Sequence, residues 1–272
     1  MNNNANPLRV LITGASSGIG YELAKLLAKE GFNLILTARR TERLNQLKSE
    51  IEQESKHSLD IRIYSEDLSQ ENAAEDLFNQ VKNDNLKIDV LVNNAGMGDL
   101  SYFHESDINK LSTMLHLNIN SLTKLSRLFI DDIKNSNKGA LINIASTASF
   151  QPVPLMAVYA ATKAYVKSFS LAVMTELQEI NSPAKVICIC PGVTETEFFA
   201  NANANPLGLP EGFIASSAEV AEFILKKLKN HEDGIAVHGG MNSFLTLLSR
   251  ILATKASNAI SMKIMQRLKQ RI

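Results

Sequence analysis

Seven short apolar runs alternate with longer amphipathic stretches along the 272-residue chain. Each run is rich in valine, isoleucine and leucine and does not alternate strictly with polar residues, which is typical of a strand covered on both faces. Such strand–helix alternation predicts a parallel sheet with right-handed crossovers and helices on both faces. The predicted strands cover residues 8–13, 33–38, 60–64, 88–92, 140–145, 185–190 and 234–237.

The stretches between these runs have the periodicity of amphipathic helices. We expect helices at residues 19–30, 44–54, 73–82, 108–133, 159–180 and 218–229. The strands and helices use up most of the chain, and neither a linker nor a repeat separates them. We therefore predict a single α/β domain of the doubly wound type over residues 8–240. Residues 1–7 are expected to be a disordered leader, and residues 241–272 a basic amphipathic helical tail.

Several residues that could bind or react with a ligand stand at or just past the ends of the predicted strands. In open α/β sheets, ligands bind in the crevice beyond the carboxyl ends of the strands. Residues in that position are therefore the first candidates for a functional site. They are Gly14, Arg39, Asp67, Asn93, Ser146 and Pro191.

The turn after the first strand contains Gly14, Gly18 and Gly20 and leads into the helix at 19–30. Glycine lets the backbone turn tightly and approach a pyrophosphate, and the helix that follows offers unpaired N–H groups to an anion. The spacing differs from the Gly-x-Gly-x-x-Gly fingerprint of many dinucleotide sites. An ordinary turn is the alternative, but the position between a strand and an amphipathic helix favours a nucleotide site.

The end of the second strand bears on which dinucleotide is bound. An acidic residue there usually grips a free ribose 2′-hydroxyl, whereas a 2′-phosphate needs a cation. Here Ala38 stands where the acid is expected, and Arg39 and Arg40 follow it. Guanidinium groups match phosphate in geometry and charge, so we predict NADP(H) rather than NAD. The alternative is that the arginines begin a solvated helix, and it is stronger for Arg40 than for Arg39.

Two further strand ends carry candidate contacts to the adenosine part of the cofactor. Asp67 and Leu68 follow the third strand, and the carboxylate could accept from the adenine amino group or cap a helix that begins near Ser69. The sequence leaves both roles open. After the fourth strand, small residues would let the backbone pass beside the ribose, with an ordinary turn as the alternative. These small residues are Asn94, Ala95 and Gly96.

Tyr159 and Lys163 lie four positions apart in the predicted helix at 159–180 and therefore share one helix face. An ordinary tyrosine has a pKa of about 10, and a nearby ammonium lowers that pKa because it favours the phenolate. Tyr159 is then a general acid in carbonyl reduction and a general base in alcohol oxidation. Ser146, thirteen residues before Tyr159, would donate to the substrate oxygen.

Asn118 lies inside the helical pattern at 108–133, where asparagine is a poor helix former. We expect it to hold a water molecule that links Lys163 to solvent. Each of these residues has an ordinary alternative: a surface Tyr–Lys pair, a serine that caps a turn, and a surface asparagine. Their joint spacing favours catalysis.

Together these motifs resemble the short-chain dehydrogenase/reductase family, in its single-domain branch of about this length. The resemblance covers residues 8 to about 237 and implies a Rossmann-type sheet of seven strands and a nicotinamide cofactor. It implies a tetrad of Asn118, Ser146, Tyr159 and Lys163, in which Lys163 also holds the nicotinamide ribose. The basic pair at 39–40 looks like that of NADP-preferring members. Further cofactor contacts implied by the resemblance are Ser16, Ser17, Ile19, Pro191, Gly192, Val193, Thr194 and Thr196.

The segment at 192–217 is expected to be a substrate loop, because loops carry specificity in such folds. It contains Phe198, and the segment at 152–156 before Tyr159 is apolar as well. An apolar ketone, aldehyde or alcohol is therefore the expected substrate, and simple packing of the loop is the alternative. The other large apolar residues of the loop are Phe199, Leu207, Leu209 and Phe213.

The tail carries two apolar stripes and six lysines and arginines, and no acidic residue follows Asp233. A basic amphipathic helix can lie on an anionic membrane, but such a stripe more often packs onto its own domain or a second subunit. The resemblance implies a homodimer or homotetramer formed through helices such as 108–133 and 159–180. The stripes are Phe244, Leu247, Leu248 and Ile251, followed by Ile264, Met265, Leu268 and Ile272.

Composition restricts the setting of this chemistry. Equal numbers of basic and acidic residues, 28 each, provide no field that would draw the chain to nucleic acid. Cys188 and Cys190 are alternate residues of one apolar run, which is typical of buried free thiols in a reducing cytosol rather than a disulfide or metal site. No targeting or membrane-spanning pattern is present, so we expect a cytoplasmic protein, with a membrane-peripheral location as the alternative.

The predicted function is NADP(H)-dependent interconversion of a carbonyl and an alcohol on a small or lipid-like substrate. One alternative is a non-catalytic NADP(H)-binding redox sensor on the same fold, which would not need Tyr159. Another is an epimerase or dehydratase that uses the cofactor transiently, although little chain remains for the additional substrate domain that such enzymes usually carry.

Overall fold

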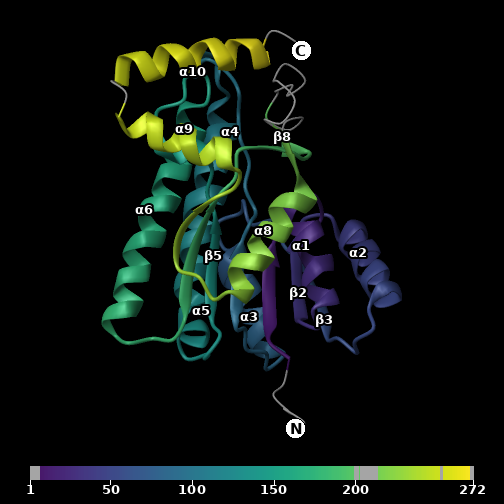
Figure 1. The fold of residues 1–272 in the computed structure, drawn as a ribbon. Helices are drawn as coiled ribbons and strands as arrows, with labels where there is room; N and C mark the ends of the chain where they lie inside the picture. The colour runs from purple at the N-terminus through teal and green to yellow at the C-terminus, as the bar shows by residue number, and fades with distance from the viewer. Residues whose placement is uncertain (1–6, 199–201, 203–213, 252–253, 270–272) are drawn as a thin grey trace.

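The computed structural model describes residues 7–198, 202, 214–251 and 254–269. Within these residues, seven strands form a parallel sheet in the order β3-β2-β1-β4-β5-β6-β9, with helices on both faces (Figure 1). This confirms the predicted doubly wound α/β fold, and six of the predicted leader residues lie outside the described part of the chain. The strands are β1 (Arg9–Thr13), β2 (Asn33–Ala38), β3 (Ile61–Ser65), β4 (Val90–Asn93), β5 (Ala140–Ile144), β6 (Lys185–Cys190) and β9 (Gly234–Val237).

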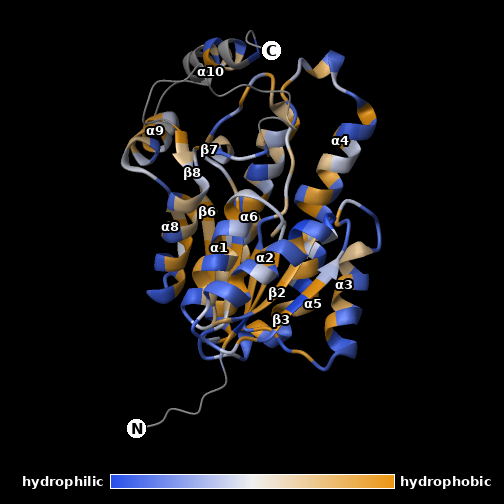
Figure 2. Ribbon diagram, turned by 90° about the vertical axis from the view of Figure 1, so that its right-hand side faces the viewer, coloured by the Kyte–Doolittle hydropathy of each residue, from blue (hydrophilic) through white to orange (hydrophobic). Residues whose placement is uncertain are grey.

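Alternate residues of the strands pack into two separate hydrophobic layers, one on each face of the sheet. Val10 and Ile12 of β1 pack with one set of helices, whereas Leu11 between them packs with the opposite set. Successive side chains of a strand point to opposite faces, which explains why the strand sequences are apolar throughout. In Figure 2 the strands are accordingly mostly orange between helices of mixed colour. The first layer contains α1 (Gly18–Lys29), α2 (Thr41–Glu54) and α8 (Ser217–Lys229); the second contains α3 (Ala73–Asn83), α5 (Leu122–Lys134) and α6 (Ala157–Glu179).

The helix predicted at 108–133 is present, but its geometry is not α-helical throughout. It consists of α4 (Ile108–Leu115), a π-helical segment at His116–Ser121, and α5. A π-helical turn holds an extra residue and often occurs at functional sites. The segment contains Asn118, whose side chain is 1% exposed.

The predicted substrate loop begins and ends as strands. β7 (Val193–Glu195) and β8 (Ile214–Ser216) form a separate two-stranded parallel sheet. This sheet ties the residues after β6 to the start of α8.

The tail forms two helices, α9 (Gly240–Ile251) and α10 (Thr254–Lys269), across the end of the molecule opposite the N-terminus (Figure 1). Met262 and Met265 of α10 pack against buried Leu100 and Leu155. The tail therefore packs onto its own domain, as one of the alternatives expected. No helix in the described part of the chain is both long enough and apolar enough to span a bilayer.

Candidate active site

A cleft of about 800 Å³ opens at the carboxyl ends of the strands. Nearly all predicted cofactor and catalytic residues line it, as the position of ligand sites in such sheets requires. Gly20 and Asn118 are the exceptions, and each acts behind the wall of the cleft. The cleft is closed on one side by α9 and α10, which contribute Asn242, Leu245, Thr246, Leu248, Ser249, Ser261, Ile264 and Met265.

The glycine-rich turn has the shape of a phosphate cradle. Gly14 and Gly18 adopt φ angles of +67° and +57°, which favour glycine. A Cβ atom on Gly20 would lie 2.6 Å from the carbonyl oxygen of Gly14, so Gly20 allows the turn to pack on itself. Ser17 precedes α1 without a side-chain capping bond, which leaves the first N–H groups of the helix to an outside acceptor. These residues fit a dinucleotide pyrophosphate.

Asn94 has a structural role that the sequence did not predict. Its Nδ2 atom donates to the carbonyl oxygen of Thr13 at 2.9 Å. The Thr13 hydroxyl in turn accepts from the backbone N–H groups of Asn94 at 3.0 Å and Ala95 at 2.9 Å. The pair therefore fixes the loop after β4 against the glycine turn, although Asn94 also lines the cleft.

Arg40, rather than Arg39, reaches the glycine turn. Its Nη2 atom donates to the hydroxyls of Ser17 at 3.0 Å and Ser16 at 3.2 Å. Arg40 directly precedes α2, as expected if the arginines begin a helix. Its side chain nevertheless points back to Ser16 and Ser17 of the glycine-rich turn. Arg39 lines the same cleft and is exposed. Both cations thus face the region where a ribose 2′-phosphate was predicted, with Arg40 the more closely held.

Asp67 caps a turn. Its Oδ1 atom accepts from the backbone N–H of Ser69 at 3.1 Å and from the Ser69 hydroxyl at 2.7 Å. Burial alone raises the pKa of Asp67, but the hydrogen bonds from Ser69 and the charge of Arg39 outweigh it and lower the pKa. The helix that follows, α3, begins at Ala73 and not near Ser69, so the capped structure is a turn that precedes the helix.

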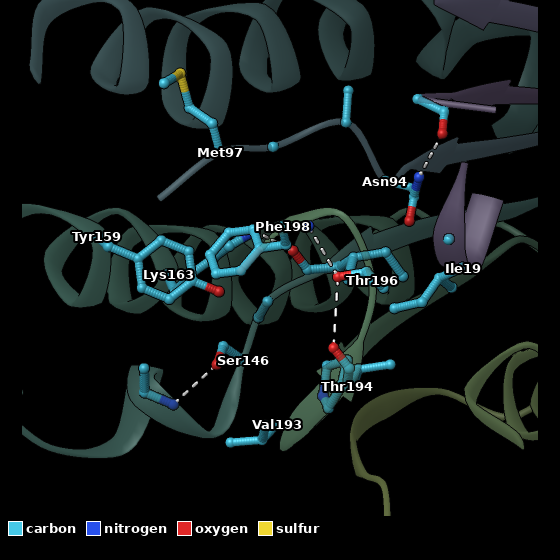
Figure 3. A pocket seen from close by; sticks show the side chains of 18 of the residues that line it. Ile19, Asn94, Met97, Ser146, Tyr159, Lys163, Val193, Thr194, Thr196 and Phe198 are labelled. Carbon is cyan, nitrogen blue, oxygen red and sulfur yellow. Dashed lines mark hydrogen bonds between the residues drawn. The ribbon is translucent and has the colours of Figure 1, made fainter. Parts of the chain in front are cut away.

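Ser146 and Tyr159 both line the cleft, from different elements (Figure 3). Ser146 follows the end of β5, and its Oγ atom accepts from the backbone N–H of Ala148 at 3.1 Å. The hydroxyl proton is therefore directed away from the backbone and can be donated. The Ser146 hydroxyl lowers the pKa of Tyr159, but the burial of the phenol is the larger effect and raises that pKa to about 12.

Lys163 lies one helical turn after Tyr159, with its Nζ atom 5.8 Å from the centroid of the phenol ring. That Nζ atom donates to the carbonyl oxygen of Ile144 at 2.7 Å. The prediction that Lys163 depresses the pKa of Tyr159 is not met in this structure, because burial dominates both groups. Burial lowers the pKa of Lys163 to about 8, so the ammonium form still prevails at neutral pH.

Asn118 positions the wall of the site. Its Oδ1 atom accepts from the backbone N–H of Met97 at 3.0 Å, and its Nδ2 atom donates to the Met97 carbonyl at 2.9 Å and to Thr162 at 3.0 Å. Asn118 thus joins the loop after β4 to α6. A water link to Lys163 stays a prediction, since the contacts of Asn118 are to Met97 and Thr162.

Three features of the site were not predicted. Glu197 forms ion pairs with Arg40 and Arg43, and the Phe198 ring lies against the Tyr159 ring with 5.2 Å between centroids. The third is the contribution of both tail helices to the cleft wall. Pairing of residues this far apart in sequence leaves no local pattern. The predicted loop residues Phe199, Leu207, Leu209 and Phe213 lie outside the described residues.

The two cysteines are buried, as predicted. Cys188 and Cys190 are free and buried in β6, with 4.0 Å between their sulfur atoms. No group of three or more histidine, cysteine or acidic side chains suited to a metal ion occurs in the part of the chain that the structure describes.

Comparisons with known proteins identify the family of the chain. The short chain dehydrogenase family model matches residues 9–207. The chain is 30% identical over 246 residues to the human very-long-chain 3-oxoacyl-CoA reductase, which covers 88% of this chain and 74% of that protein.

Two solved structures share the fold over almost their full length. One is a short-chain dehydrogenase from Sphingobium yanoikuyae in complex with NADPH, with a TM-score of 0.78, 28% identity, and coverage of 90% of this chain and 94% of that one. The other is the bulky-bulky ketone specific alcohol dehydrogenase from Comamonas testosteroni, with a TM-score of 0.74, 28% identity, and coverage of 91% and 93%. The glycine cradle, the Ser146–Tyr159–Lys163 arrangement and these similarities lead to one conclusion: the chain belongs to the short-chain dehydrogenase/reductase family of oxidoreductases.

Proposed function

We propose that the protein is an NADP(H)-dependent oxidoreductase that interconverts a ketone or aldehyde and an alcohol on an apolar, lipid-like substrate. One observation carries the proposal: a single cleft places Ser146 and Tyr159 beside both the glycine turn and an apolar wall. That wall combines Val153 and Met156 with side chains of α9 and α10. A relative named as a reductase of very-long-chain 3-oxoacyl-CoA and a structural neighbour specific for bulky ketones support an apolar carbonyl substrate.

The choice of NADP(H) is supported by the cations at the end of β2. Arg40 donates to Ser16 and Ser17 of the glycine-rich turn, and Arg39 lines the same cleft. The residue before them, Ala38, has no carboxylate to hold a free 2′-hydroxyl. The structural neighbour with bound NADPH supports the same cofactor.

The residues divide the chemistry as follows. When bound, a reduced nicotinamide cofactor supplies the hydride, and the glycine turn and the N-terminus of α1 would hold its pyrophosphate. Tyr159 donates its phenolic proton to the carbonyl oxygen, since the phenol is fully protonated at neutral pH. Ser146 donates a hydrogen bond to the same oxygen and stabilises its developing negative charge. Lys163 would hold the nicotinamide ribose, since its Nζ atom lies in the cleft one helical turn from Tyr159 and is fixed by the Ile144 carbonyl.

A cofactor-oxidation screen over ketones and aldehydes of graded chain length, run with NADPH and with NADH, tests the proposal. We expect NADPH to be oxidised, with kcat/KM rising with chain length until the apolar wall is filled. Preference for NADH with every substrate would contradict the cofactor assignment. Binding of NADPH without turnover of any carbonyl would favour the redox sensor instead.

We also propose a cytoplasmic protein that touches anionic membranes through its tail. Three apolar residues of α9 support contact with lipid, because they are 56–60% exposed: Met241, Phe244 and Leu247. Flotation of the full chain with vesicles containing phosphatidylserine tests this. We expect flotation that high salt and the Phe244→Asp/Leu247→Asp double variant both reduce. Ile180→Asp, which changes an equally exposed residue of the main domain, is the matched control.

A homo-oligomer is proposed on separate grounds. Ile108 and Leu115 of α4 and Tyr165 of α6 are exposed apolar or aromatic side chains on the helices that the family resemblance assigns to subunit contacts. Light scattering after size exclusion should give the mass of a dimer or tetramer. A mass of about 30 kDa at micromolar concentration would contradict it.

A further inference from the structure

A carboxylate of the protein already occupies the predicted 2′-phosphate site. The Oε2 atom of Glu197 lies 2.8 Å from Nη2 of Arg40, and its Oε1 atom lies 2.7 Å from Nη1 of Arg43. The same Nη2 atom of Arg40 donates to the hydroxyls of Ser16 and Ser17. Glu197 therefore neutralises the cation that the site offers to a phosphate.

This ion pair can exchange with a solute anion. The side chains of Arg40 and Glu197 are 41% and 39% exposed, so water and ions reach both. The hydrogen bond from Arg40 lowers the pKa of Glu197, which is thus fully charged at neutral pH. Exposed ion pairs of this kind are weak and are screened by salt.

The residues on either side of Glu197 also line the cleft. The Thr196 methyl group would lie 2.9 Å from a Cβ atom on Gly18, so Thr196 packs directly on the glycine turn. On the other side, Phe198 fills the space that Gly98 leaves, with its Cζ atom 2.4 Å from the position of a Gly98 Cβ. The Phe198 ring also lies against the ring of Tyr159 (Figure 3).

Glu197 and Phe198 are adjacent in sequence, so the ion pair with Arg40 and the ring contact with Tyr159 belong to one short segment. We propose that Glu197 is an internal competitor of the cofactor 2′-phosphate, and that Phe198 leaves Tyr159 when the phosphate takes the place of the carboxylate. This inference rests on the proposed use of NADP(H). A phosphate carries more charge than a carboxylate and pairs more strongly with guanidinium, so it displaces Glu197.

A cofactor without the 2′-phosphate has nothing to exchange for the carboxylate. NAD(H) would therefore meet a cleft in which Glu197 still pairs with Arg40 and Phe198 still lies against Tyr159. Glu197 is in this sense a specificity-determining residue, because it opposes the wrong cofactor as well as competing with the right one. The coupling between the phosphate site and Phe198 is reciprocal, as any linkage between two sites must be.

Calorimetric titration with adenosine 2′,5′-bisphosphate tests the competition without catalysis, because this probe has the 2′-phosphate and no nicotinamide. We expect Glu197→Gln to bind it about two- to fivefold more tightly than the natural chain, which is the range for loss of an exposed ion pair. ADP should bind both proteins equally. Glu195→Gln is the matched control, since Glu195 lies two residues earlier and forms no ion pair in the part of the chain that the structure describes.

The movement of Phe198 has its own reporter. The chain contains no tryptophan, so Phe198→Trp introduces a single tryptophan beside Tyr159, and its emission can be excited apart from that of the five tyrosines. We expect the bisphosphate, and not ADP, to change its emission. Adding Glu197→Gln to this variant should produce most of that change before any ligand is present.

The outcomes separate the two proposals. If Glu197→Gln binds the bisphosphate no more tightly than the natural chain does, the competition is wrong while the NADP(H) assignment stands. If the bisphosphate binds but the tryptophan emission does not change, the proposed coupling to Phe198 is wrong. If neither protein distinguishes the bisphosphate from ADP, the NADP(H) assignment fails and this inference fails with it.

Discussion

The Nζ atom of Lys163 donates to the carbonyl oxygen of Ile144 at 2.7 Å, which joins α6 to the end of β5 two residues before Ser146. The bond sets the distance between the helix that carries Tyr159 and the strand that leads to Ser146. It also places an ammonium group in the interior, where Lys163 is 6% exposed. A buried charge of this kind makes stability depend on pH.

Stability should rise with pH in the alkaline range because of Lys163. Its pKa is about 8 in the folded protein and about 10.4 in an unfolded chain. Between these values the unfolded chain binds more protons, so deprotonation favours the folded state. Relative to Lys163→Met, the natural chain should gain about 2 kcal/mol of unfolding free energy between pH 8 and pH 10. Urea denaturation of both proteins at both pH values measures this difference. The titration of Tyr159 contributes equally to the two proteins and therefore cancels.

Tyr159→Phe should lower the rate of carbonyl reduction by about 10²- to 10⁴-fold, the range for loss of a general acid. NADPH binding should change little, because the ring that lines the cleft is kept. Tyr165→Phe is the control on the same helix, since that hydroxyl contacts Thr123 at 2.9 Å and lies outside the cleft. Equal rates for the two variants would assign the proton to another group.

Gly18→Ala should weaken NADPH binding. The new Cβ would stand 2.9 Å from the Thr196 methyl group, on a backbone with φ of +57°. The left-handed conformation costs about 1–2 kcal/mol for a non-glycine residue, so urea stability should also fall. Gly240→Ala is the matched control, because a Cβ there meets no atom within 4 Å. Unchanged calorimetric affinity for NADPH in Gly18→Ala would remove this turn from the cofactor site.

Met265→Trp should shorten the longest substrate that the enzyme accepts. Met265 lines the apolar end of the cleft from α10, and a larger ring there excludes part of an alkyl chain. Loss of contact with two methylene groups would reduce kcat/KM for long ketones roughly tenfold. Short ketones should be unaffected. Met241→Trp, on the exposed side of α9, should leave the whole chain-length profile as it is.

Local patterns were sufficient for the sheet and for most of the cleft. Gly14, Asn94 and Ser146 lie at the carboxyl ends of their strands because strand position follows from short apolar runs. The change to π-helical geometry around Asn118 could not be predicted from the sequence. A π-helical turn inserts one residue without ending the helix, so the apolar periodicity on both sides still looks helical.

Properties that depend on burial or on distant contacts could not be predicted. Spacing places Lys163 one turn from Tyr159, yet the pKa of the phenol depends on how deeply it is buried. The contact of Glu197 with Arg43 joins residues 154 positions apart, and nothing near either residue indicates it. The strands β7 and β8 have three residues each, which is too short for a periodic signal.

The tail helices have a consequence for how new specificities arise. They follow β9, the last strand of the sheet, and yet they wall the apolar end of the cleft. Exchange of everything after the β9–α9 junction would replace the part of the substrate wall that α9 and α10 supply, and would leave Val153, Met156, the glycine turn and Tyr159 in place. A chimera joined there should acquire substrate specificity from the donor of the tail and keep the cofactor of the main domain. A single recombination event could therefore change the substrate of such an enzyme.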